Sequence, residues 1–179
     1  MDKKSHIKIA SVTFSSLFPF YGTLKRYAYI YGSVEPDLNV FTYLRGHGEK
    51  RVRAYILEEL NRLSRKQYWS ILDFYKAGRI SHYIVDSFTL PHTRMFKGNI
   101  KEHIAWEKTL ARKVMGENEF PVRRDIGFTL DEMKERYLSA KASIENDILF
   151  SISALFRLLQ RAFTPELAIQ FSLEKASIR

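Results

Sequence analysis

The sequence predicts an all-α fold, a single compact multi-helix domain over residues 1–179, and three observations support it. Glycine and proline are sparse, at 8 and 5 residues, so few breakers interrupt the chain. Hydrophobic residues make up 45% of the chain, which is enough for a substantial core. Apolar residues recur at helical spacing, as in Ile148, Ile152 and Leu155. No shift in composition and no internal repeat indicates a second domain.

Breakers and capping signals divide the chain into its expected helices. Helices are expected over about 5–16, 23–31, 50–63, 65–90, 99–115 and 129–161, with a last one after Pro165. Ser5 is the expected N-cap of the first helix. A capping box joins Asn99 to Glu102 at the start of the fifth. Thr129 and Glu132 form a second capping box at the start of the sixth.

Three of the expected boundaries depend on glycine or proline. The segment 32–39, "GSVEPDLN", is expected to be a loop that carries Asp37. The segment 45–50, "RGHGEK", is expected to be a second loop, in which two glycines flank His47. Gly78 is expected to interrupt the fourth helix.

Composition narrows the classes of function. The chain has no cysteine, which excludes disulfides, thiolate zinc sites and a cysteine nucleophile. The formal charge of +9 favours anionic partners such as phosphates, acidic membrane surfaces or nucleic acid, although solvated helix faces explain it equally well. Neither a signal peptide nor a long apolar span is visible, so a cytoplasmic location is expected. The amphipathic segment 155–163 favours core packing over membrane contact.

All five histidines combine with three carboxylates in one pattern. Its members are His6, Asp37, His47, His82, Asp86, His92, His103 and Glu107. His82 and Asp86 form H-x-x-x-D, and a spacing of four places both side chains on one face of a helix. His103 and Glu107 form H-x-x-x-E in the same way. Imidazole nitrogen and carboxylate oxygen are ligands that zinc takes, and this set exceeds the needs of one ion. The sequence therefore predicts a site for two or three metal ions.

Ordinary structural roles remain open for each carboxylate. Asp37 follows a proline and could be a turn residue or a helix N-cap. Asp86 could pair with Arg79, and Glu107 could pair with Lys101. Each of these roles is plausible for one residue alone, so the metal hypothesis depends on the pattern as a whole.

The order of these residues resembles the zinc-dependent bacterial phospholipase C family, which shares its fold with fungal single-strand-specific zinc nucleases. The matching segments are "SHIKIA" at 5–10, "GSVEPD" at 32–37, "RGH" at 45–47, "ISHYIVDSFTLPH" at 80–92 and "EHIAWE" at 102–107. The resemblance implies an all-α fold of the phospholipase C and zinc nuclease type.

The resemblance also implies three places for metal ions. The ligands would be Asp37, His47, His82 and Asp86 for the first, His92, His103 and Glu107 for the second, and His6 with Asp86 for the third. In the family an N-terminal tryptophan completes the third place, whereas Trp69 and Trp106 are internal here. The Met1 backbone, Asp2 or water would complete it instead, or it would hold no ion. Two zinc ions are therefore expected, and a third is left open.

The function that the resemblance implies is metal-dependent hydrolysis of phosphodiester bonds, with a phospholipid or a related phosphodiester as substrate. Asp37 would orient or deprotonate the attacking water. No segment matches a headgroup pocket, so the substrate-binding residues are unknown. Two rivals stay open: a single-strand nuclease on the same fold, with nucleic acid as the less favoured partner, and a helical domain that binds metal without catalysis. Peripheral membrane contact and the oligomeric state also stay open.

Overall fold

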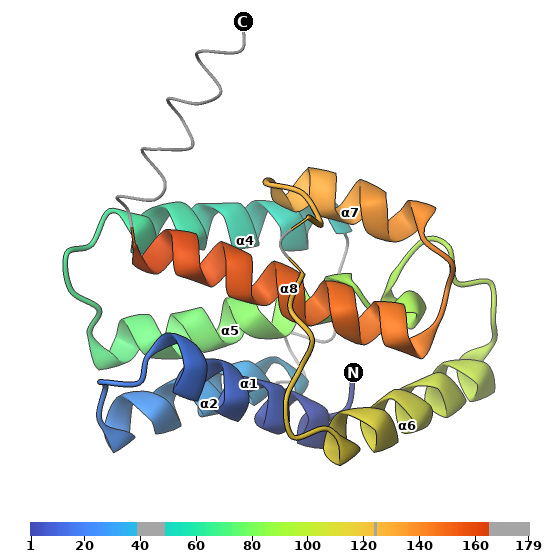
Figure 1. Cartoon of the computed structure of the whole chain (residues 1–179), viewed down its shortest axis with the longest axis horizontal. Coiled ribbons are helices and arrows are strands. Elements are labelled where there is room, and N and C mark those ends of the chain that lie inside the picture. Colours follow the sequence, from blue (N-terminus) through green and yellow to red (C-terminus); the bar gives the residue numbers. More distant parts are fainter. Residues whose placement is uncertain (39–48, 124, 165–179) are drawn as a thin grey trace, which may run out of the picture.

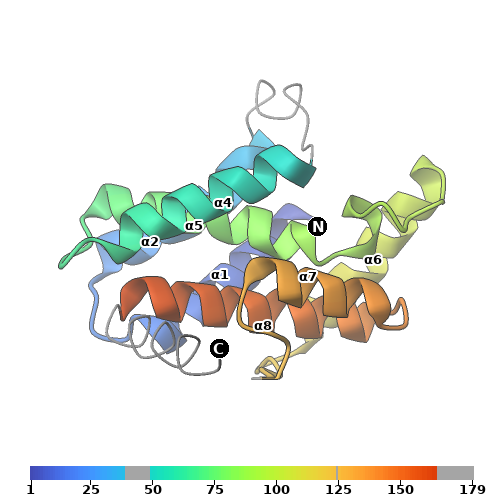
Figure 2. The same ribbon diagram turned by 90° about the horizontal axis from the view of Figure 1, so that it is seen from above.

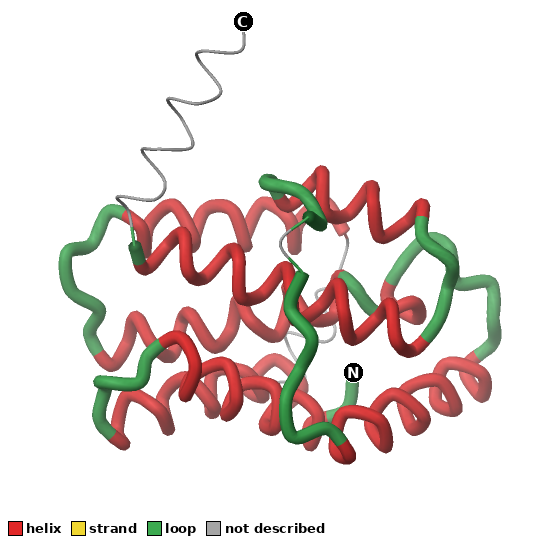
Figure 3. The backbone as a smooth tube through the Cα atoms, in the orientation of Figure 1, coloured by secondary structure: helices red, strands yellow, loops and turns green. Residues whose placement is uncertain are grey.

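The chain is built from helices and their connecting loops. The computed structural model describes residues 1–38, 49–123 and 125–164. Within these ranges there are seven α-helices, one 3-10 helix and no strand, which confirms the all-α prediction (Figures 1 and 3). The elements are α1 (Lys3–Leu17), α2 (Thr23–Leu38), α4 (Glu49–Ser64), α5 (Ile71–Ser87), η1 (Leu90–His92), α6 (Ile100–Gly116), α7 (Leu130–Ser139) and α8 (Ile144–Phe163).

The helix α5 is central to the fold. It packs against α1, α2, α4 and α8. In Figure 1, α5 and α8 cross the middle of the molecule, with α4 and α7 on one side and α1 and α2 on the other. Figure 2 shows α2, α4 and α5 on one side and α7 and α8 on the other. Eleven of the 17 residues of α5 are buried, as expected for a helix with neighbours on several faces.

An aromatic cluster holds together the end of α1, the start of α5 and the end of α8. Phe18, just after α1, lies edge-on to Phe74 with ring centroids 5.1 Å apart, and edge-on to Phe163 at 5.0 Å. Trp69 packs edge-on against the same two rings, at 5.5 and 5.3 Å. These contacts fix α1 and α5 side by side. The histidines of both helices lie at the opposite ends, away from this cluster.

The helix α2 is longer than predicted, because the segment 32–38 is helical where the sequence predicts a loop. Gly32 and Gly78 bring α2 and α5 so close that a Cβ on either residue would lie within 3.0 Å of the other helix. Pro36 is accommodated in the last turn of α2. Packing against α5 therefore outweighs the local breakers, and α5 itself runs through Gly78 without interruption. As a result Asp37 lies in a helical turn.

Two helix starts also differ from prediction. The N-cap of α1 is Asp2 and not Ser5: Oδ1 of Asp2 accepts the N–H of Ser5 at 2.9 Å. The start of α5 is later than predicted, at Ile71, because Ser70 and Asp73 form a capping box there. The short-range capping signal determines where α5 begins.

The predicted long helix 129–161 is in fact two helices, α7 and α8. Ser143 caps α8, with its Oγ accepting the N–H of Asn146 at 3.1 Å, and the residues before it allow the chain to fold back. Both predicted capping boxes are confirmed at the starts of α6 and α7. The predicted helix after Pro165 lies outside the described residues.

The amphipathic segment 155–163 packs into the core, as predicted. Leu155, Leu158, Leu159 and Ala162 are buried, and Phe156 and Phe163 are partly buried against the core. Among the helices in the described ranges, none has both the length and the apolar character needed to cross a bilayer.

Candidate metal centre

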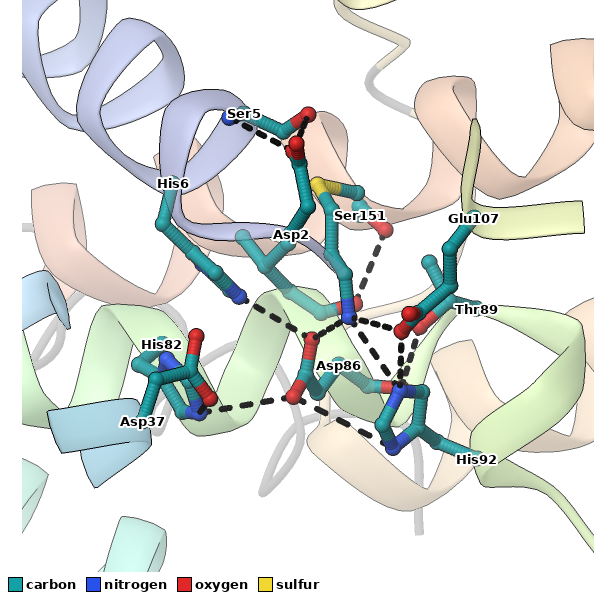
Figure 4. A network of polar contacts seen from close by, with 12 residues as sticks. Asp2, Ser5, His6, Asp37, His82, Asp86, Thr89, His92, Glu107 and Ser151 are labelled. Atoms are coloured by element: carbon teal, nitrogen blue, oxygen red, sulfur yellow. Dashed lines mark hydrogen bonds and ion pairs between the residues drawn. The ribbon is translucent and has the colours of Figure 1, made fainter. Parts of the chain in front are cut away.

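The C-terminal half of α5 supplies the centre of a polar cluster (Figure 4). Nε2 of His82 lies 3.4 Å from Oδ2 of Asp86, one turn further along the helix. His6, from α1, stacks on His82 with ring centroids 4.2 Å apart, and its Nε2 lies 3.2 Å from Oδ1 of Asp86. Asp37, from the last turn of α2, places Oδ1 3.7 Å from Nε2 of His82. Three helices therefore converge on this point.

A second set of side chains lies where η1 faces α6. Oε1 of Glu107 lies 3.3 Å from Nε2 of His92 and 3.3 Å from Nε2 of His103. The spacing of four along α6 brings His103 and Glu107 together, and the 3-10 turn that begins at Leu90 presents His92 to them. Each of the three side chains is 26% exposed, so this set opens to solvent.

Asp86 and the α-amino group of Met1 join the two sets. Oδ2 of Asp86 lies 4.0 Å from Nδ1 of His92. The Met1 amine lies 2.9 Å from Oδ1 of Asp86, 3.0 Å from Oε1 of Glu107 and 3.1 Å from Nε2 of His92. The structure thus brings together seven of the eight predicted ligands. The eighth, His47, lies outside the described residues.

The donor set fits a divalent cation. In each of two groups, one His6–Asp37–His82 and the other His92–His103–Glu107, one ligand atom from every residue lies within 4.8 Å of the others. Nε2 of His6 and Nε2 of His82 are both buried without a hydrogen-bond partner among the described residues. Buried polar atoms that lack a partner are costly, and a bound cation would satisfy both.

The orientation of His82 strengthens this fit. Its Nδ1 lies 3.1 Å from the backbone oxygen of Ser33, and since a carbonyl only accepts, this hydrogen bond places the proton on Nδ1. Nε2 of neutral His82 then presents its lone pair to Asp37 and Asp86, which are themselves acceptors. A lone pair that faces carboxylates is unfavourable unless a cation lies between them. A backbone carbonyl that fixes the second ring nitrogen is a common partner of histidine ligands.

Burial and charge set the protonation of the cluster. Burial, aided by His6, lowers the pKa of His82 to about 4, and burial also lowers the pKa of His6, so both rings are neutral near pH 7. Burial alone would raise the pKa of Asp86, but the Met1 amine and the histidines outweigh it and hold that pKa well below its usual value. Burial opposes charge on the Met1 amine as well, yet Asp86 and Glu107 raise its pKa to about 10. Neutral imidazoles beside ionised carboxylates are the protonation states that metal binding requires.

Asp147 of α8 holds in place the segments that carry His92, His103 and Glu107. The sequence gives no sign of this role. It is fully buried, and its Oδ2 accepts the backbone N–H of Leu90 at 3.0 Å and Nε1–H of Trp106 at 2.8 Å. Oδ1 accepts the hydroxyl of Tyr137 at 2.7 Å. Leu90 begins η1 and Trp106 precedes Glu107, so one carboxylate ties both ligand-bearing segments to α8. In the sequence Asp147 falls inside the predicted helix 129–161, where nothing in the local pattern distinguishes it from other acidic residues.

The ordinary roles considered for the carboxylates do not match the structure. Arg79 pairs with Glu35, at 2.9 Å, and not with Asp86. Glu107 contacts the histidines of its set and the Met1 amine, and Asp37 lies in the last turn of α2 and, among the described residues, caps no helix N-terminus. Asp2 is used as the cap of α1.

A solvent-accessible pocket of about 270 Å³ opens onto the cluster. Asp86 and His92 line it, together with Tyr83, Thr93 and Lys134. A small anionic group could therefore reach the residues that join the two sets.

An all-helical fold that gathers imidazoles and carboxylates at its helix ends defines a candidate di-metal centre. The chain belongs to the zinc-dependent phospholipase C family, whose family model matches residues 5–154. This match confirms the family predicted from the residue pattern and contains all eight predicted ligands. No curated protein and no solved structure matches the chain.

Proposed function

We propose that the chain hydrolyses the phosphodiester bond of phospholipids, in the manner of a phospholipase C, with zinc bound at the two adjoining sets. The observation that carries the proposal is the lone pair of His82, which the Ser33 carbonyl directs at two carboxylates. Membership of a zinc-dependent phospholipase C family supports the reaction class.

The chain's own residues would divide the work of binding. His82, His6 and Asp37 would hold one ion, and His92, His103 and Glu107 a second, with Asp86 shared between them; His47 stays a predicted ligand of the first. Zinc, when bound, lowers the pKa of water and neutralises charge that develops on phosphoryl oxygens. The buried rings keep their nitrogens unprotonated, and the Ser33 carbonyl and Asp147 keep the ligand-bearing segments in place.

Asp37 is our candidate to orient the attacking water and to take its proton. Its side chain is 27% exposed, whereas that of Asp86 is only 8% exposed. Asp37 is therefore more accessible to solvent than Asp86, so that a water molecule could reach its carboxylate. A positioned carboxylate of this kind contributes roughly 100-fold or more to a hydrolysis rate.

The test is hydrolysis by zinc-loaded protein. The substrates are soluble short-chain phospholipids with different headgroups, a generic aryl phosphodiester and single-stranded DNA. We expect phospholipid cleavage into a diacylglycerol and a phosphomonoester. Asp37→Asn should lower kcat by roughly 100-fold, while Glu58→Gln, an exposed carboxylate change on α4, should leave it unchanged.

Two other results of this assay would indicate one of the alternative functions. Cleavage of single-stranded DNA alone would replace the proposal with a nuclease. Stoichiometric zinc binding without cleavage of any of these substrates would indicate a domain that uses the metals only for stability or for binding a partner. In that case His103→Ala would lower the melting temperature and the zinc content with no activity to lose.

A further inference from the structure

A second pocket, of about 310 Å³, lies directly beside the pocket of the metal centre. The two pockets share Ser87 and Lys134 in their linings. Three contacts hold the Lys134 side chain between the two pockets. Its ammonium donates to the carbonyl oxygen of Ser87 and lies 5.8 Å from the ring centroid of Phe88 and 5.7 Å from that of Tyr137. A phosphodiester at the metal centre could therefore extend a substituent past Lys134 into the second pocket.

The second pocket is rich in cationic side chains. Its cations are Lys50, Arg53, Arg94 and Lys134, and its carboxylates are Asp131 and Glu135. Arg53 holds Asp131 in a two-pronged ion pair, with Nε–Oδ1 at 2.6 Å and Nη2–Oδ2 at 2.5 Å, so these two charges offset each other. The remaining three cations face one carboxylate, and the pocket carries a net positive charge.

The lining also indicates which headgroups it suits. Leu130 and Leu138 form its apolar part, and no aromatic side chain lines it among the described residues. Recognition of a quaternary ammonium such as choline uses aromatic faces, and the described part of this lining offers none. Lysine and arginine side chains bind phosphate or carboxylate groups through charge-assisted hydrogen bonds. The chemistry of the pocket is that of an anion site.

We propose that this pocket binds a phosphate group on the substrate's headgroup, so that the enzyme prefers phospholipids with a phosphorylated headgroup over those with a neutral or choline headgroup. The inference rests on the proposed phospholipase function and names the substrate class within it. Lys134 is positioned to contact both the scissile phosphodiester and the second phosphate. Arg94 and Lys50 would contact only the second phosphate, because they line the second pocket alone.

The test compares dihexanoyl phosphatidylinositol with dihexanoyl phosphatidylinositol 4-phosphate, both as soluble monomers, so that recruitment to a charged surface plays no part. We expect kcat/KM to favour the phosphorylated lipid by roughly tenfold or more. Arg94→Gln, and separately Lys50→Gln, should bring the ratio towards one. Arg112→Gln, an exposed change of the same charge on α6, should keep the wild-type ratio. Equal rates for both lipids in the wild type, or an Arg94→Gln ratio that matches the wild type, would overturn the proposal.

A binding measurement separates this proposal from the proposed function. If neither lipid is hydrolysed, the proposed function fails, and calorimetry with glycerophosphoinositol and its 4-phosphate still reports on the pocket of the zinc-loaded protein. Tighter binding of the 4-phosphate, lost in Arg94→Gln, would support the anion site. Equal affinity for both compounds would refute it. Inorganic phosphate that binds as tightly as the 4-phosphate, and equally depends on Arg94, would show a site for free phosphate and would refute headgroup recognition.

Discussion

Gly32 of α2 and Gly78 of α5 bring the backbones of their helices into direct contact. A Cβ built on Gly32 would lie within 3.0 Å of the backbone of Tyr75, and a Cβ on Gly78 would lie equally close to that of Tyr29. This approach sets the position of the whole of α2, including its last turn. It therefore places Asp37 beside His82, which lies one turn beyond Gly78 on α5.

Replacing Gly78 with alanine should separate α2 from α5. The added methyl group would meet a backbone carbonyl, which cannot rotate away as a side chain can, so the helices must shift. We expect the free energy of unfolding to fall by about 2–3 kcal/mol. Zinc affinity should fall as well, because Asp37 moves relative to His82. Thermal melting and zinc titration measure the two effects.

The matched control is Gly116→Ala at the end of α6, where a Cβ would have no atom within 4 Å. This change should leave stability unchanged or raise it by up to about 1 kcal/mol, since alanine restricts the unfolded chain. If Gly78→Ala behaved like Gly116→Ala, the close approach of α2 and α5 would not determine the position of Asp37.

The same glycine pair shows why part of the fold could not be read from the sequence. Gly32 and Pro36 predict a loop by their local preferences, and only the packing of α2 against α5, which is distant in the sequence, overrides them. By contrast, the helix starts at α6 and α7 follow from capping boxes that act over three residues, and both predictions are confirmed. The prediction failed where tertiary contacts decide the conformation.

The candidate metal site also has a part that the sequence predicts and a part that it does not. The pairs His82–Asp86 and His103–Glu107 were predictable because a spacing of four brings two side chains together on any helix. That both pairs bind metal stays a prediction. The support from Asp147 was not predictable, because its three donors come from η1, α6 and α7, and nothing in the local sequence specifies them.

Replacing Asp147 with alanine should destabilise the fold and loosen the second metal-binding set. The change leaves the Leu90 N–H, the Trp106 indole and the Tyr137 hydroxyl without their acceptor in a buried site. Each unsatisfied buried donor costs about 1–3 kcal/mol, so we expect a total loss of at least about 3 kcal/mol. Urea unfolding measures this loss, and calorimetric zinc titration should show weaker binding of one ion.

Asp147→Asn provides the comparison, because the amide oxygen can still accept from Leu90 and Trp106. It should cost less stability than Asp147→Ala and retain most of the zinc affinity. Equal losses in both variants would show that charge, and not the hydrogen bonds, is what Asp147 contributes.

The stability of the metal-free protein should fall in mild acid. The pKa of His82 is about 4 in the folded chain and near 6.5 in the unfolded chain, because burial disfavours the charged ring. Between these values the unfolded chain binds a proton that the folded chain lacks, so its population grows as pH falls. This contribution to stability is fully present above pH 6.5 and is lost progressively towards pH 4. His6, whose pKa is also lowered, acts in the same direction.

The measurement is the free energy of unfolding in urea as the pH is lowered from neutral towards the folded-state pKa of His82, in the presence of a chelator. In His82→Gln the decrease in stability over the acid range should be smaller than in the wild type, because the titrating ring is absent. A wild-type stability that stays constant or rises with acidification would contradict the neutral, buried state of His82.

Removing one histidine from each set should show that the two sets bind separate ions. His103 lies in the partly exposed set at η1 and α6, whereas His6 is buried beside His82. His103→Ala and His6→Asn should each lower the zinc content by about one ion per chain, and the double variant by about two, because each set supplies the three protein ligands that a catalytic zinc site needs. The zinc content of dialysed protein, measured by elemental analysis, tests this directly, with Glu58→Gln as the carboxylate control.

Since Asp86 touches both sets, some coupling is expected, so that loss of one ion weakens the affinity for the other. Loss of all zinc in His103→Ala, with the fold intact by circular dichroism, would instead indicate that the cluster binds its metals as one indivisible unit.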